Sequence, residues 1–440
     1  MNSISAFIVF FVYLSFGFGY VYGVEFDHEK LINYGSTVTK ADALKTRDTV
    51  MLTEFGAIGD GTDETEKIQR ALNAASGKTL YVPKQRQKHY LTGQLLIPSN
   101  TNILFQKGVV FLAKDDLKQH IRTAESLFRF EGVENVVFDG NGAVFKMNKE
   151  KYSGEFNHII MINGAKNIVV KNVNALNSGG DGFYIGAAWT KRVASENIRF
   201  YNCVAENNRR QGMSVVSVDG LYVEDCRFLN TRGTLPEAGV DIEPGQPNYV
   251  LNKIHFKNCL AEGNNGRGFQ VVLIKSGPKS NSIDIVFEDC KAIGNDIGFS
   301  NRYFAEGSKG VVRMINCIAE NSRGPGFWEG SCAASGASKE YRNCSAINNG
   351  ANLSLATVKK TSGFGISNFP KRQKKILGNS IFVNCKTIDN RKKSITDFGF
   401  SIVDKSQFQK VSVKNFASSG HLKKEIDAKS GDVGITTSLK

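Results

Sequence analysis

Apolar and polar residues alternate along much of the chain in short runs that Gly and Asn interrupt. Residues Ile283–Glu288, for example, read Ile-Asp-Ile-Val-Phe-Glu, with an apolar side chain at every second position. A period of two between turn-forming residues indicates short β-strands. Inside this patterned region no apolar i, i+3, i+4 stripe is long enough for a helix, so helical solenoids and leucine-rich repeats fit poorly.

The strands belong to a sequence unit that recurs about every 30 residues. In each unit an apolar or aromatic residue and an Asn or Asp precede a Cys, and a Gly followed by an apolar residue comes later. The cysteines are Cys203, Cys226, Cys259, Cys290, Cys317, Cys344 and Cys385, and the glycines are Gly182, Gly212, Gly239, Gly268, Gly298, Gly326 and Gly399. Such repeats of short strands predict an all-β fold, a right-handed parallel β-helix (a solenoid) with one coil per repeat.

Stacked coils place equivalent residues above one another at a spacing of ~4.8 Å. We expect the Asn and Cys columns to lie inside the coil and the residue after each Gly to form a core stack. Seven of the eight cysteines share one repeat position, which predicts buried free thiols. Cys332 lies outside that column, and one disulfide from it to Cys317 or Cys344 stays open.

A different pattern precedes the repeats. From Glu64 to Ala75 the apolar residues Ile68, Leu72 and Ala75 share one face, which predicts a short helix with Thr62 or Asp63 as its N-cap. We expect this helix to cover the N-terminal end of the solenoid, where strand edges and core would otherwise meet water.

These patterns divide the chain into four parts. An apolar and aromatic run at 4–22 is typical of a secretory signal peptide, with an uncleaved membrane anchor as the alternative. We therefore predict a signal peptide at 1–23, an N-terminal extension at 24–48, the capped β-helix at 49–415 and a C-terminal tail at 416–440. The mature protein is expected to be secreted or periplasmic and to carry no membrane segment.

The net charge of +14, on a chain with only 22% charged residues, favours an acidic partner. For an exported β-helix without a nucleic-acid recognition module, we expect an acidic polysaccharide and no nucleic acid. The basic runs Lys371–Lys375 and Arg391–Lys393 account for part of the excess as solvated surface.

Alternation from each Gly predicts which side chains share the outer face of one sheet. The residue two positions after the Gly points outward, which defines a column of Tyr184, Ser214, Asp241, Gln270, Ser300 and Trp328. Glu243 and Arg302 belong to the next outward column, and Asp181, Arg210, Gln211 and Arg267 lie just before a Gly. Carboxylates, arginines and aromatics together are unusual for a solvated face, so we place the active site here.

Three carboxylates are the candidate catalytic residues. Asp241 and Glu243 stand ~7 Å apart along one strand face, where each raises the pKa of the other, which suits a general acid. Asp181 lies two coils earlier, at ~10 Å, near the upper end of the separation in inverting glycosidases. Asp241 and Glu243 could instead hold a structural Ca²⁺ or pair with arginines, and Asp181 could be a turn residue. No metal ligands are assigned, and Ca²⁺ is the one cofactor considered.

The substrate-binding candidates are Arg210, Gln211, Tyr184, Arg267, Gln270, Arg302 and Trp328. Arginines would bind a substrate carboxylate or sulfate in bidentate fashion, and the aromatic rings would stack on sugars. His158 and His255 fall outside the columns and are expected to be ordinary strand residues.

The N-terminal segment also resembles a known superfamily. The opening Phe-Gly-Ala-x-Gly-Asp-Gly-x-Asp at 55–63 and its neighbours, the helix and Tyr81-Val-Pro83, are similar to pectate-lyase-like right-handed β-helix proteins. That group includes polygalacturonases, rhamnogalacturonases, mannuronan C5-epimerases and phage tailspike depolymerases. Over residues 50–415 the resemblance implies a glycan-processing enzyme. Asp241 matches the Asp of the epimerase Asp-Pro-His-Glu motif but no His follows, and only Asn177–Asp181 echoes polygalacturonases, so neither close family is assigned.

Three functions therefore stay open. The first is an exported enzyme that hydrolyses glycosidic bonds of an acidic polysaccharide by carboxylate acid/base catalysis. The second is a lyase or C5-epimerase acting on uronic acids, with Ca²⁺ at the acidic cluster and Arg210, Arg267, Lys275 or Tyr184 taking the C5 proton. The third is a non-catalytic glycan-binding solenoid. An oligomer is compatible with all three, although the sequence shows no assembly domain.

Overall fold

The computed structural model describes residues 48–85, 87–121, 123–352, 361–368, 376–403, 408–428 and 433–436. The predicted signal peptide, nearly all of the predicted N-terminal extension and the basic run Lys371–Lys375 lie outside these residues. Within the described ranges, no helix has both the length and the hydropathy that crossing a membrane requires.

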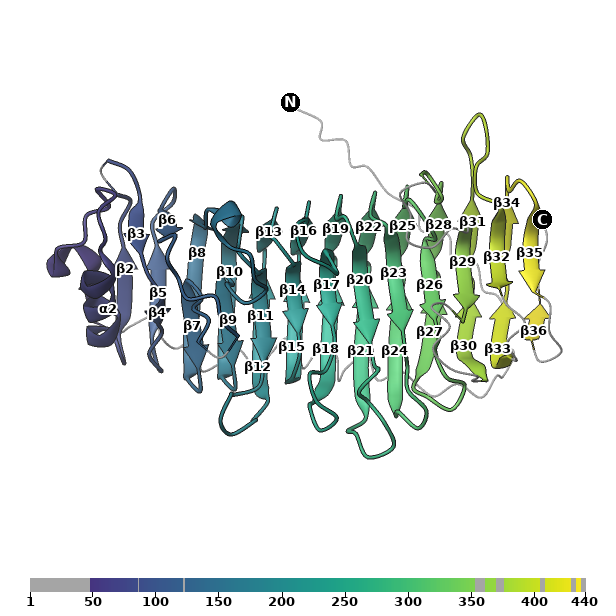
Figure 1. Cartoon of the computed structure of the whole chain (residues 1–440), viewed down its shortest axis with the longest axis horizontal. Coiled ribbons are helices and arrows are strands. Elements are labelled where there is room, and N and C mark those ends of the chain that lie inside the picture. The colour runs from purple at the N-terminus through teal and green to yellow at the C-terminus, as the bar shows by residue number, and fades with distance from the viewer. Residues whose placement is uncertain are drawn as a thin grey trace, which may run out of the picture.

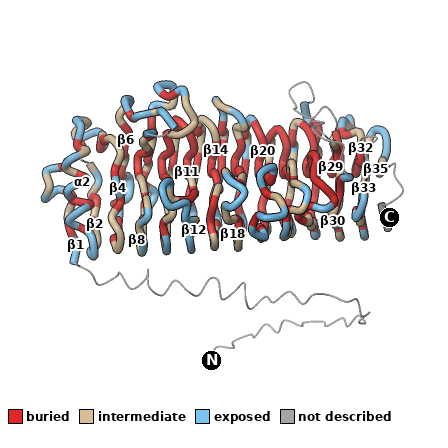
Figure 2. Tube along the Cα trace, turned by 60° about the horizontal axis from the view of Figure 1, so that its bottom comes forward, coloured by how far each residue is buried: buried red, intermediate tan, exposed pale blue. Residues whose placement is uncertain are grey.

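The chain is a right-handed parallel β-helix, as predicted. Figure 1 shows its coils side by side along one axis, from α2 at the N-terminal end to β35 and β36 at the other. In the described part of the chain, all pairings between the named strands are parallel, for example β11 with β14 and β12 with β15. Figure 2 shows buried positions running along the strands and exposed positions gathered at the turns.

One sheet has 12 strands and carries the candidate site, and we call it the site sheet. Its strands are β4 (Leu95–Leu96), β7 (Phe128–Glu131), β9 (Ile160–Asn163), β11 (Asp181–Gly186), β14 (Gln211–Val215), β17 (Ala238–Ile242), β20 (Arg267–Val272), β23 (Ile297–Arg302), β26 (Phe327–Gly330), β29 (Ser362–Ser367), β32 (Phe398–Val403) and β35 (Lys424–Ala428).

The other sheet has 24 strands, and most coils contribute two of them. They are β1 (Thr49–Met51), β2 (Thr79–Val82), β3 (Tyr90–Thr92), β5 (Asn102–Phe105), β6 (Val110–Ala113), β8 (Glu134–Lys146), β10 (Lys166–Leu176), β12 (Ser195–Tyr201), β13 (Val204–Glu206), β15 (Val218–Glu224), β16 (Arg227–Leu229), β18 (Leu251–Lys257), β19 (Leu260–Glu262), β21 (Ile283–Glu288), β22 (Lys291–Ile293), β24 (Gly310–Ile315), β25 (Ile318–Glu320), β27 (Ser338–Arg342), β28 (Ser345–Ile347), β30 (Leu377–Val383), β31 (Lys386–Ile388), β33 (Phe408–Lys414), β34 (Ala417–Ser419) and β36 (Val433–Thr436). Two short 3-10 helices, η3 (Leu52–Phe55) and η4 (Lys149–Lys151), lie in connections.

The aromatic residues after the glycines stack inside the coil, as expected from the repeat. Phe269, Phe299, Phe327 and Phe364 are paired in register on successive strands of the site sheet. Their ring centroids are 5.0, 4.9 and 4.6 Å apart, and neighbouring rings are nearly parallel. Each ring therefore buries both of its faces against the coil above and the coil below.

The Cys column is also inside, and all eight cysteines are buried free thiols. The disulfide left open for Cys332 is therefore not formed. The prediction that the preceding Asn column is internal is wrong. These Asn residues adopt left-handed backbone angles at a corner of the coil, which turns their side chains outward, where they hydrogen-bond to one another; Asn343 Nδ2 donates to Asn316 Oδ1 at 3.1 Å. The internal amides come from a second column: Asn208, Asn264, Asn295 and Asn349.

The repeated glycines are needed because backbone from the next coil approaches them closely. A Cβ on Gly268 would lie 2.6 Å from the carbonyl oxygen of Gly298 and 2.9 Å from the Ala292 Cβ. We expect Gly268→Ala to destabilise the protein by about 1–3 kcal/mol, because neither neighbour is a flexible side-chain end. Gly277→Ala is the control, since nothing lies within 4 Å of its Cβ, and it should change stability by less than about 0.5 kcal/mol. Urea unfolding measures both, and equal midpoints for the two variants would contradict this explanation.

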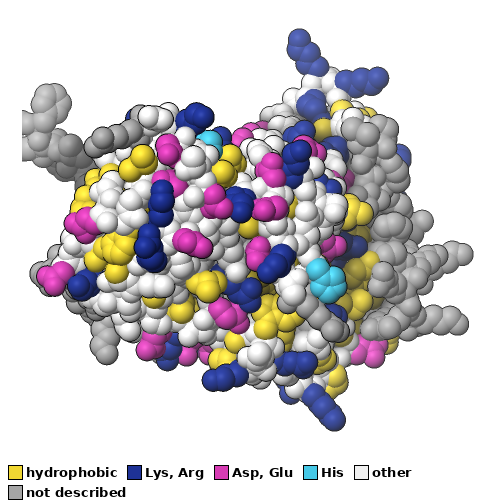
Figure 3. All heavy atoms as spheres, turned by 60° about the vertical axis from the view of Figure 1, so that its left-hand side comes forward, with side chains coloured by type: hydrophobic (Ala, Val, Ile, Leu, Met, Phe, Trp, Pro, Cys, Tyr) yellow, Lys and Arg dark blue, Asp and Glu magenta, His cyan; other side chains and the backbone are white. Residues whose placement is uncertain are grey.

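Helix α2 (Thr65–Ala74) covers the N-terminal end of the solenoid. It buries Ile68, Ala71 and Leu72 in the same core cluster as Leu80 and Leu95. Figure 3 views this end, where acidic and basic side chains are interspersed with apolar ones. The prediction of Thr62 or Asp63 as the N-cap is wrong, because the cap position is Glu64, which makes no side-chain capping bond. Asp63 instead accepts a hydrogen bond from the Thr65 amide at 3.0 Å.

The prediction of a tail at 416–440 is wrong, since strands continue beyond residue 415. β34 pairs with β31, β35 with β32 and β36 with β33, so both sheets extend past the predicted boundary. Ile426 packs against the core from β35. The predicted boundary is too early because the last Cys of the repeat is Cys385. Strands beyond it are still buried by alternating apolar residues, which form without a Cys in the repeat.

A polar cluster interrupts the apolar core between the two sheets. Lys339 on β27 and Glu329 on β26 are both buried, with Nζ and Oε2 3.5 Å apart. Lys339 Nζ also donates to the Gly378 carbonyl at 2.5 Å, and Ser380 Oγ donates to Glu329 Oε2 at 2.8 Å. In neighbouring coils the position of Lys339 is occupied by Val312 and that of Glu329 by Ile366. Their other in-register neighbours, Ser380 beside Lys339 and Asn301 beside Glu329, are polar, so the ion pair belongs to a small polar layer of the solenoid.

Candidate active site

The outer face of the site sheet carries the column that the glycines predicted. Tyr184 pairs with Ser214, Ser214 with Asp241, and Asp241 with Gln270, and the same column continues to Ser300 and Trp328. Glu243 follows β17 two residues after Asp241, and Arg302 ends β23. The register expected from the sequence is therefore right over six successive coils.

These side chains are far less exposed than an outer face implies. Asp181, Gln211, Asp241, Arg267, Gln270 and Trp328 are all buried, with Asp241 only 4% exposed, whereas Tyr184, Arg210, Glu243 and Arg302 are partly exposed. Polar side chains from adjacent coils pack on one another and exclude water between them. Trp328 is a correction to the prediction. Its indole packs on Ile297, and Nε1 donates to Ser367 Oγ at 3.0 Å, which leaves no free ring face for a sugar.

Two amides hold the Asp241 carboxylate. Gln211 Nε2 donates to Oδ2 at 2.9 Å and Gln270 Nε2 donates to Oδ1 at 3.0 Å. A hydrogen bond to the oxygen of each side-chain amide sets its orientation. The Ala238 backbone amide donates to Gln211 Oε1, and Arg302 donates to Gln270 Oε1. Burial raises the pKa of Asp241, while hydrogen bonds from Gln270 and Gln211 and the charges of Arg210 and Arg302 oppose that shift. The pKa of Asp241 is raised on balance, and the two N–H groups limit that rise because they stabilise the ionised form.

Glu243 is the partly exposed carboxyl beside this fixed charge. Burial raises its pKa, and the charge of Asp241 raises it further, against Arg210, Lys275 and Arg302. Within the described part of the chain its carboxyl makes no hydrogen bond. A carboxyl group with a raised pKa, no partner and access to solvent can donate a proton to a bound molecule.

Asp181 lies in a second, sealed group of titratable residues. Burial raises its pKa to about 7, with smaller contributions from Asp241 and Glu155 and opposing ones from Arg210 and Ser214. Arg210 lies between two carboxylates, with Nε 3.2 Å from Glu155 Oε2 and NH1 3.5 Å from Asp181 Oδ2. Because Asp181 is fully buried, it can influence the charge of the site but does not reach its surface.

His158 belongs to this group, so the prediction that it is an ordinary strand residue is wrong. The Asp181 backbone amide donates to His158 Nδ1 at 3.0 Å, which places the ring proton on Nε2. The ring stacks on Tyr184 at 4.8 Å, and burial followed by Arg210 lowers the pKa of His158 to about 3. The repeat gave no signal for it, because its coil lacks the Gly landmark. His255 does lie elsewhere, on the other sheet, 2.9 Å from Glu288.

Arg267 is a buried cation on β20, the strand that pairs with β17, which carries Asp241. In the described ranges its guanidinium makes no hydrogen bond, and its Nε is fully buried. Burial lowers the pKa of Arg267 to about 10, and the nearby charge of Arg302 lowers it further, against Asp296, Asp241 and Tyr303. The predicted alternative, an Asp241–Arg267 ion pair, is not formed, since glutamines occupy the carboxylate. An unpaired guanidinium of this kind can bind an anion.

The calcium alternative depends on how the acidic side chains are arranged. Across the residues that the structure describes, no group of three or more His, Cys, Asp or Glu side chains is arranged to hold one. Asp241, the centre of the calcium alternative, has each oxygen engaged by an amide N–H, an arrangement that suits a carboxylate held by the protein rather than a calcium ligand.

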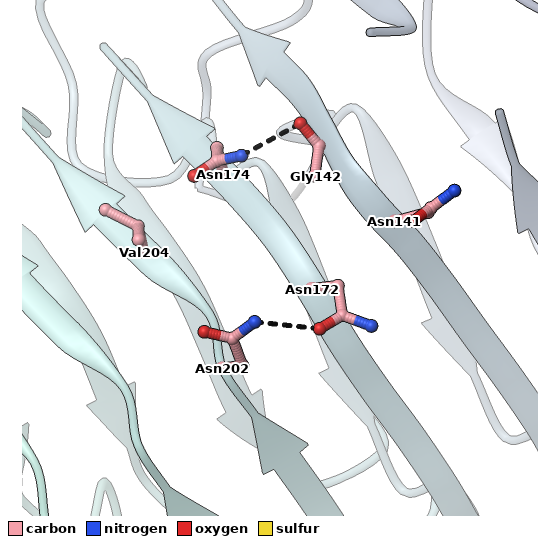
Figure 4. A pocket seen from close by; sticks show the side chains of 6 residues that line it. All are labelled: Asn141, Gly142, Asn172, Asn174, Asn202 and Val204. Atoms are coloured by element: carbon pink, nitrogen blue, oxygen red, sulfur yellow. Dashed lines mark hydrogen bonds between the residues drawn. The ribbon is translucent and has the colours of Figure 1, made fainter. Parts of the chain in front are cut away.

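A separate hollow of about 290 Å³ lies on the other sheet, and the sequence did not single it out. Figure 4 shows its lining: Asn141, Gly142, Asn172, Asn174, Asn202 and Val204. Asn202 Nδ2 donates to Asn172 Oδ1 at 2.9 Å, and Asn174 Nδ2 donates to the Gly142 carbonyl at 3.1 Å. These side-chain amides form hydrogen bonds from one coil to the next, so we interpret them as part of the scaffold.

Comparison with known proteins supports the fold. Residues 129–284 match the family model for the right handed beta helix region. The A-module of a mannuronan C-5 epimerase from Azotobacter vinelandii is 15% identical with a TM-score of 0.69, over 89% of this chain and 99% of that one. Polygalacturonase from Erwinia carotovora is 14% identical with a TM-score of 0.55, over 88% of this chain and 97% of the enzyme.

Among sequence relatives, the pre-neck appendage protein of Bacillus phage B103 is 25% identical over 48% of this chain and 26% of its own length. The matched segments cover 37% and 26% of the length of two curated relatives of this chain. The findings make this chain a right-handed β-helix protein, with neighbours in that fold that act on polysaccharides. At these identities the likeness is one of fold, and no closer family is defined.

Proposed function

We propose that the protein is an exported enzyme that hydrolyses glycosidic bonds in an acidic polysaccharide. The observation that carries the proposal is the pairing of two unlike carboxyl groups on β17 and its extension. Two oriented amides donate to the two oxygens of Asp241. Glu243 beside it is partly exposed, has a raised pKa, and its carboxyl makes no hydrogen bond to any described residue. Burial raises the pKa of both carboxyl groups, but only Asp241 has hydrogen-bond donors on both oxygens that stabilise its ionised form. We therefore assign Asp241 as the base and Glu243 as the acid of glycoside hydrolysis.

In this mechanism Glu243 protonates the leaving glycosidic oxygen and Asp241 accepts a proton from the attacking water. Their i, i+2 positions on one strand place them ~7 Å apart, within the range of about 6.5–9.5 Å found in inverting enzymes. Asp181 has a supporting role. While it is protonated, the positive charge of Arg210 is offset by Glu155 alone and stays available to an anionic substrate.

Two arginines without an ion-pair partner among the described residues support an acidic substrate. In that part of the chain the buried guanidinium of Arg267 makes no hydrogen bond, and Arg302 lies close enough to lower the pKa of Arg267. Two guanidinium groups side by side repel one another, and a carboxylate or sulfate between them relieves that repulsion. The net charge of +14 acts in the same direction over longer distances. Export rests on the apolar run at 4–22, and likeness to a phage appendage protein agrees with action outside a cell.

A screen of uronate-containing and sulfated polysaccharides tests the proposal. Each polymer is incubated with the protein and assayed both for new reducing ends and for ultraviolet absorbance. We expect new reducing ends without absorbance, because hydrolysis leaves no double bond. The same reaction in EDTA should proceed at an unchanged rate. Reducing ends that appear together with absorbance and disappear in EDTA would contradict the hydrolase.

The second candidate is a lyase or C5-epimerase. Arg267 favours it, because burial and Arg302 bring the pKa of this arginine down to about 10, nearer to that of a base that could take the C5 proton. Unsaturated products from the screen would select this function. A non-catalytic glycan-binding solenoid is the third, and it predicts binding without turnover on every polymer.

A further inference from the structure

We propose a second anion-binding site, formed by Lys149, Arg209 and Arg232, at the turn edge of the site sheet. It would bind a carboxylate or sulfate group of the glycan away from the bond that is cleaved. The identity of the ligand as a glycan rests on the proposed function, whereas the anion site itself does not. We call these three residues the turn cluster.

The three cations come from segments far apart in the sequence. Lys149 begins η4, Arg209 lies in the turn between β13 and β14, and Arg232 lies in the loop between β16 and β17. Lys149 Nζ reaches across the intervening coil, where it donates to Asn207 Oδ1 at 2.7 Å and to the Arg232 carbonyl at 3.2 Å. The Arg232 amide donates to the Asn208 carbonyl at 3.1 Å, and the Thr234 amide donates to the Arg209 carbonyl at 2.8 Å, so the segments that carry the two arginines lie side by side next to this lysine.

Within the described ranges, no carboxylate forms an ion pair within 4 Å of the turn cluster. The oxygens of Glu237, in the adjoining loop, accept neutral donors instead, the Gly233 amide at 2.7 Å and Asn265 Nδ2 at 2.5 Å. Burial lowers the pKa of Lys149, and Arg232 and Arg209 lower it further, while Glu150 and Glu237 oppose the shift. Arg209 adds a buried Nε that makes no hydrogen bond with any described residue. Cations gathered this closely repel one another, and a bound anion would relieve the repulsion and accept the free N–H.

The position of the turn cluster sets the kind of ligand. Arg209 immediately precedes Arg210, whose guanidinium turns to Glu155 and Asp181 instead. From Ala238, which pairs with Gln211, to Glu243 the strand alone extends ~17 Å. A monosaccharide cannot span that distance, so a ligand that occupies both places is a polymer with acidic groups on separate sugars.

Amine footprinting of the full chain tests the anion site directly. The protein is acylated briefly in sodium sulfate or in sodium chloride of equal ionic strength, and modified lysines are quantified by mass spectrometry. Sulfate should slow acylation of Lys149 and leave the exposed Lys191 unchanged. In Arg209→Gln/Arg232→Gln the protection of Lys149 should disappear. Equal acylation of Lys149 in the two salts would overturn the site.

Glycan binding is the second arm, with dextran sulfate, polygalacturonate and uncharged dextran as probes. Arg209→Gln/Arg232→Gln should bind an acidic probe about tenfold or more weakly than Lys291→Gln/Lys309→Gln, which removes two exposed lysines elsewhere. If Arg209→Gln/Arg232→Gln loses affinity for only one acidic probe, that probe shows whether the site binds sulfate or carboxylate groups. Equal affinities of the two variants for both acidic probes would reject the glycan role. Turnover decides only the hydrolase proposal, so either idea can fail without the other.

Discussion

Glu243→Gln is expected to lower kcat on the polysaccharide found by the screen by about 10²–10⁴-fold, with KM little changed. The substitution keeps the shape of the side chain and removes the proton that a general acid must donate, a contribution of that size in other enzymes. It should not disturb the fold, because the carboxyl is partly exposed and has no hydrogen-bonding partner among the described residues. Glu306→Gln, in an exposed loop, is the matched control and should retain full activity.

Asp241→Asn separates the two carboxyl roles in the same assay. Asp241 is the second cause, after burial, of the raised pKa of Glu243, so its removal should lower that pKa. A general acid works while protonated, so the alkaline limb of the pH–rate profile should move to lower pH in Asp241→Asn as kcat falls. Normal turnover in both Asp241→Asn and Glu243→Gln would reject the carboxylate mechanism, and a loss in both without any shift in the pH profile would reject the assigned roles.

Lys339→Met is expected to destabilise the protein by about 3–5 kcal/mol, the cost of leaving one partner of a buried ion pair behind. Glu329 would then be a buried carboxylate without a counter-charge, with Ser380 still donating to Oε2 and Oε1 making no hydrogen bond to a described residue. Urea unfolding followed by circular dichroism measures the loss. The control is Lys166→Met, which breaks an exposed pair with Glu196 and should cost less than about 1 kcal/mol.

The double variant Lys339→Met/Glu329→Gln separates the effect of the unpaired Glu329 charge from the effect of packing around Lys339. It removes both ionic groups, so most of the stability lost in Lys339→Met should return, since replacing a buried pair is often nearly neutral. A double variant as unstable as Lys339→Met would show that packing around the lysine stem, rather than the unpaired charge, causes the loss.

The sequence could set the coil register because its landmarks are backbone requirements. Gly268 recurs where only a hydrogen atom fits between coils, so counting from it places Asp241 opposite Gln270 correctly. The burial of individual side chains could not be predicted from the register. Alternation shows which face of the sheet a side chain occupies, but not which other side chains pack over it. Trp328 and Asp181 were therefore expected at the surface and are enclosed.

His158 was missed for a related reason. It occupies the same strand level as Asp181, since Ile160 pairs with Phe183, but its coil has no Gly or Cys from which to count. The contacts that bring it to the site are made by the ring of Tyr184 and the Asp181 amide, two coil-to-coil interactions that no local pattern in the sequence encodes.

The buried Cys column gives the coils between Cys203 and Cys385 thiols whose modification can be followed one by one during unfolding. Burial raises the pKa of Cys290, and the thiol donates to the Phe256 carbonyl of the preceding coil at 3.4 Å, so a reagent reaches it only when that coil opens. Coils of a solenoid depend mainly on their neighbours, so opening can be local. From Cys203 to Cys385 the chain thus contains intrinsic labelling sites, and rates of thiol modification would map stability along the axis without any engineered probe.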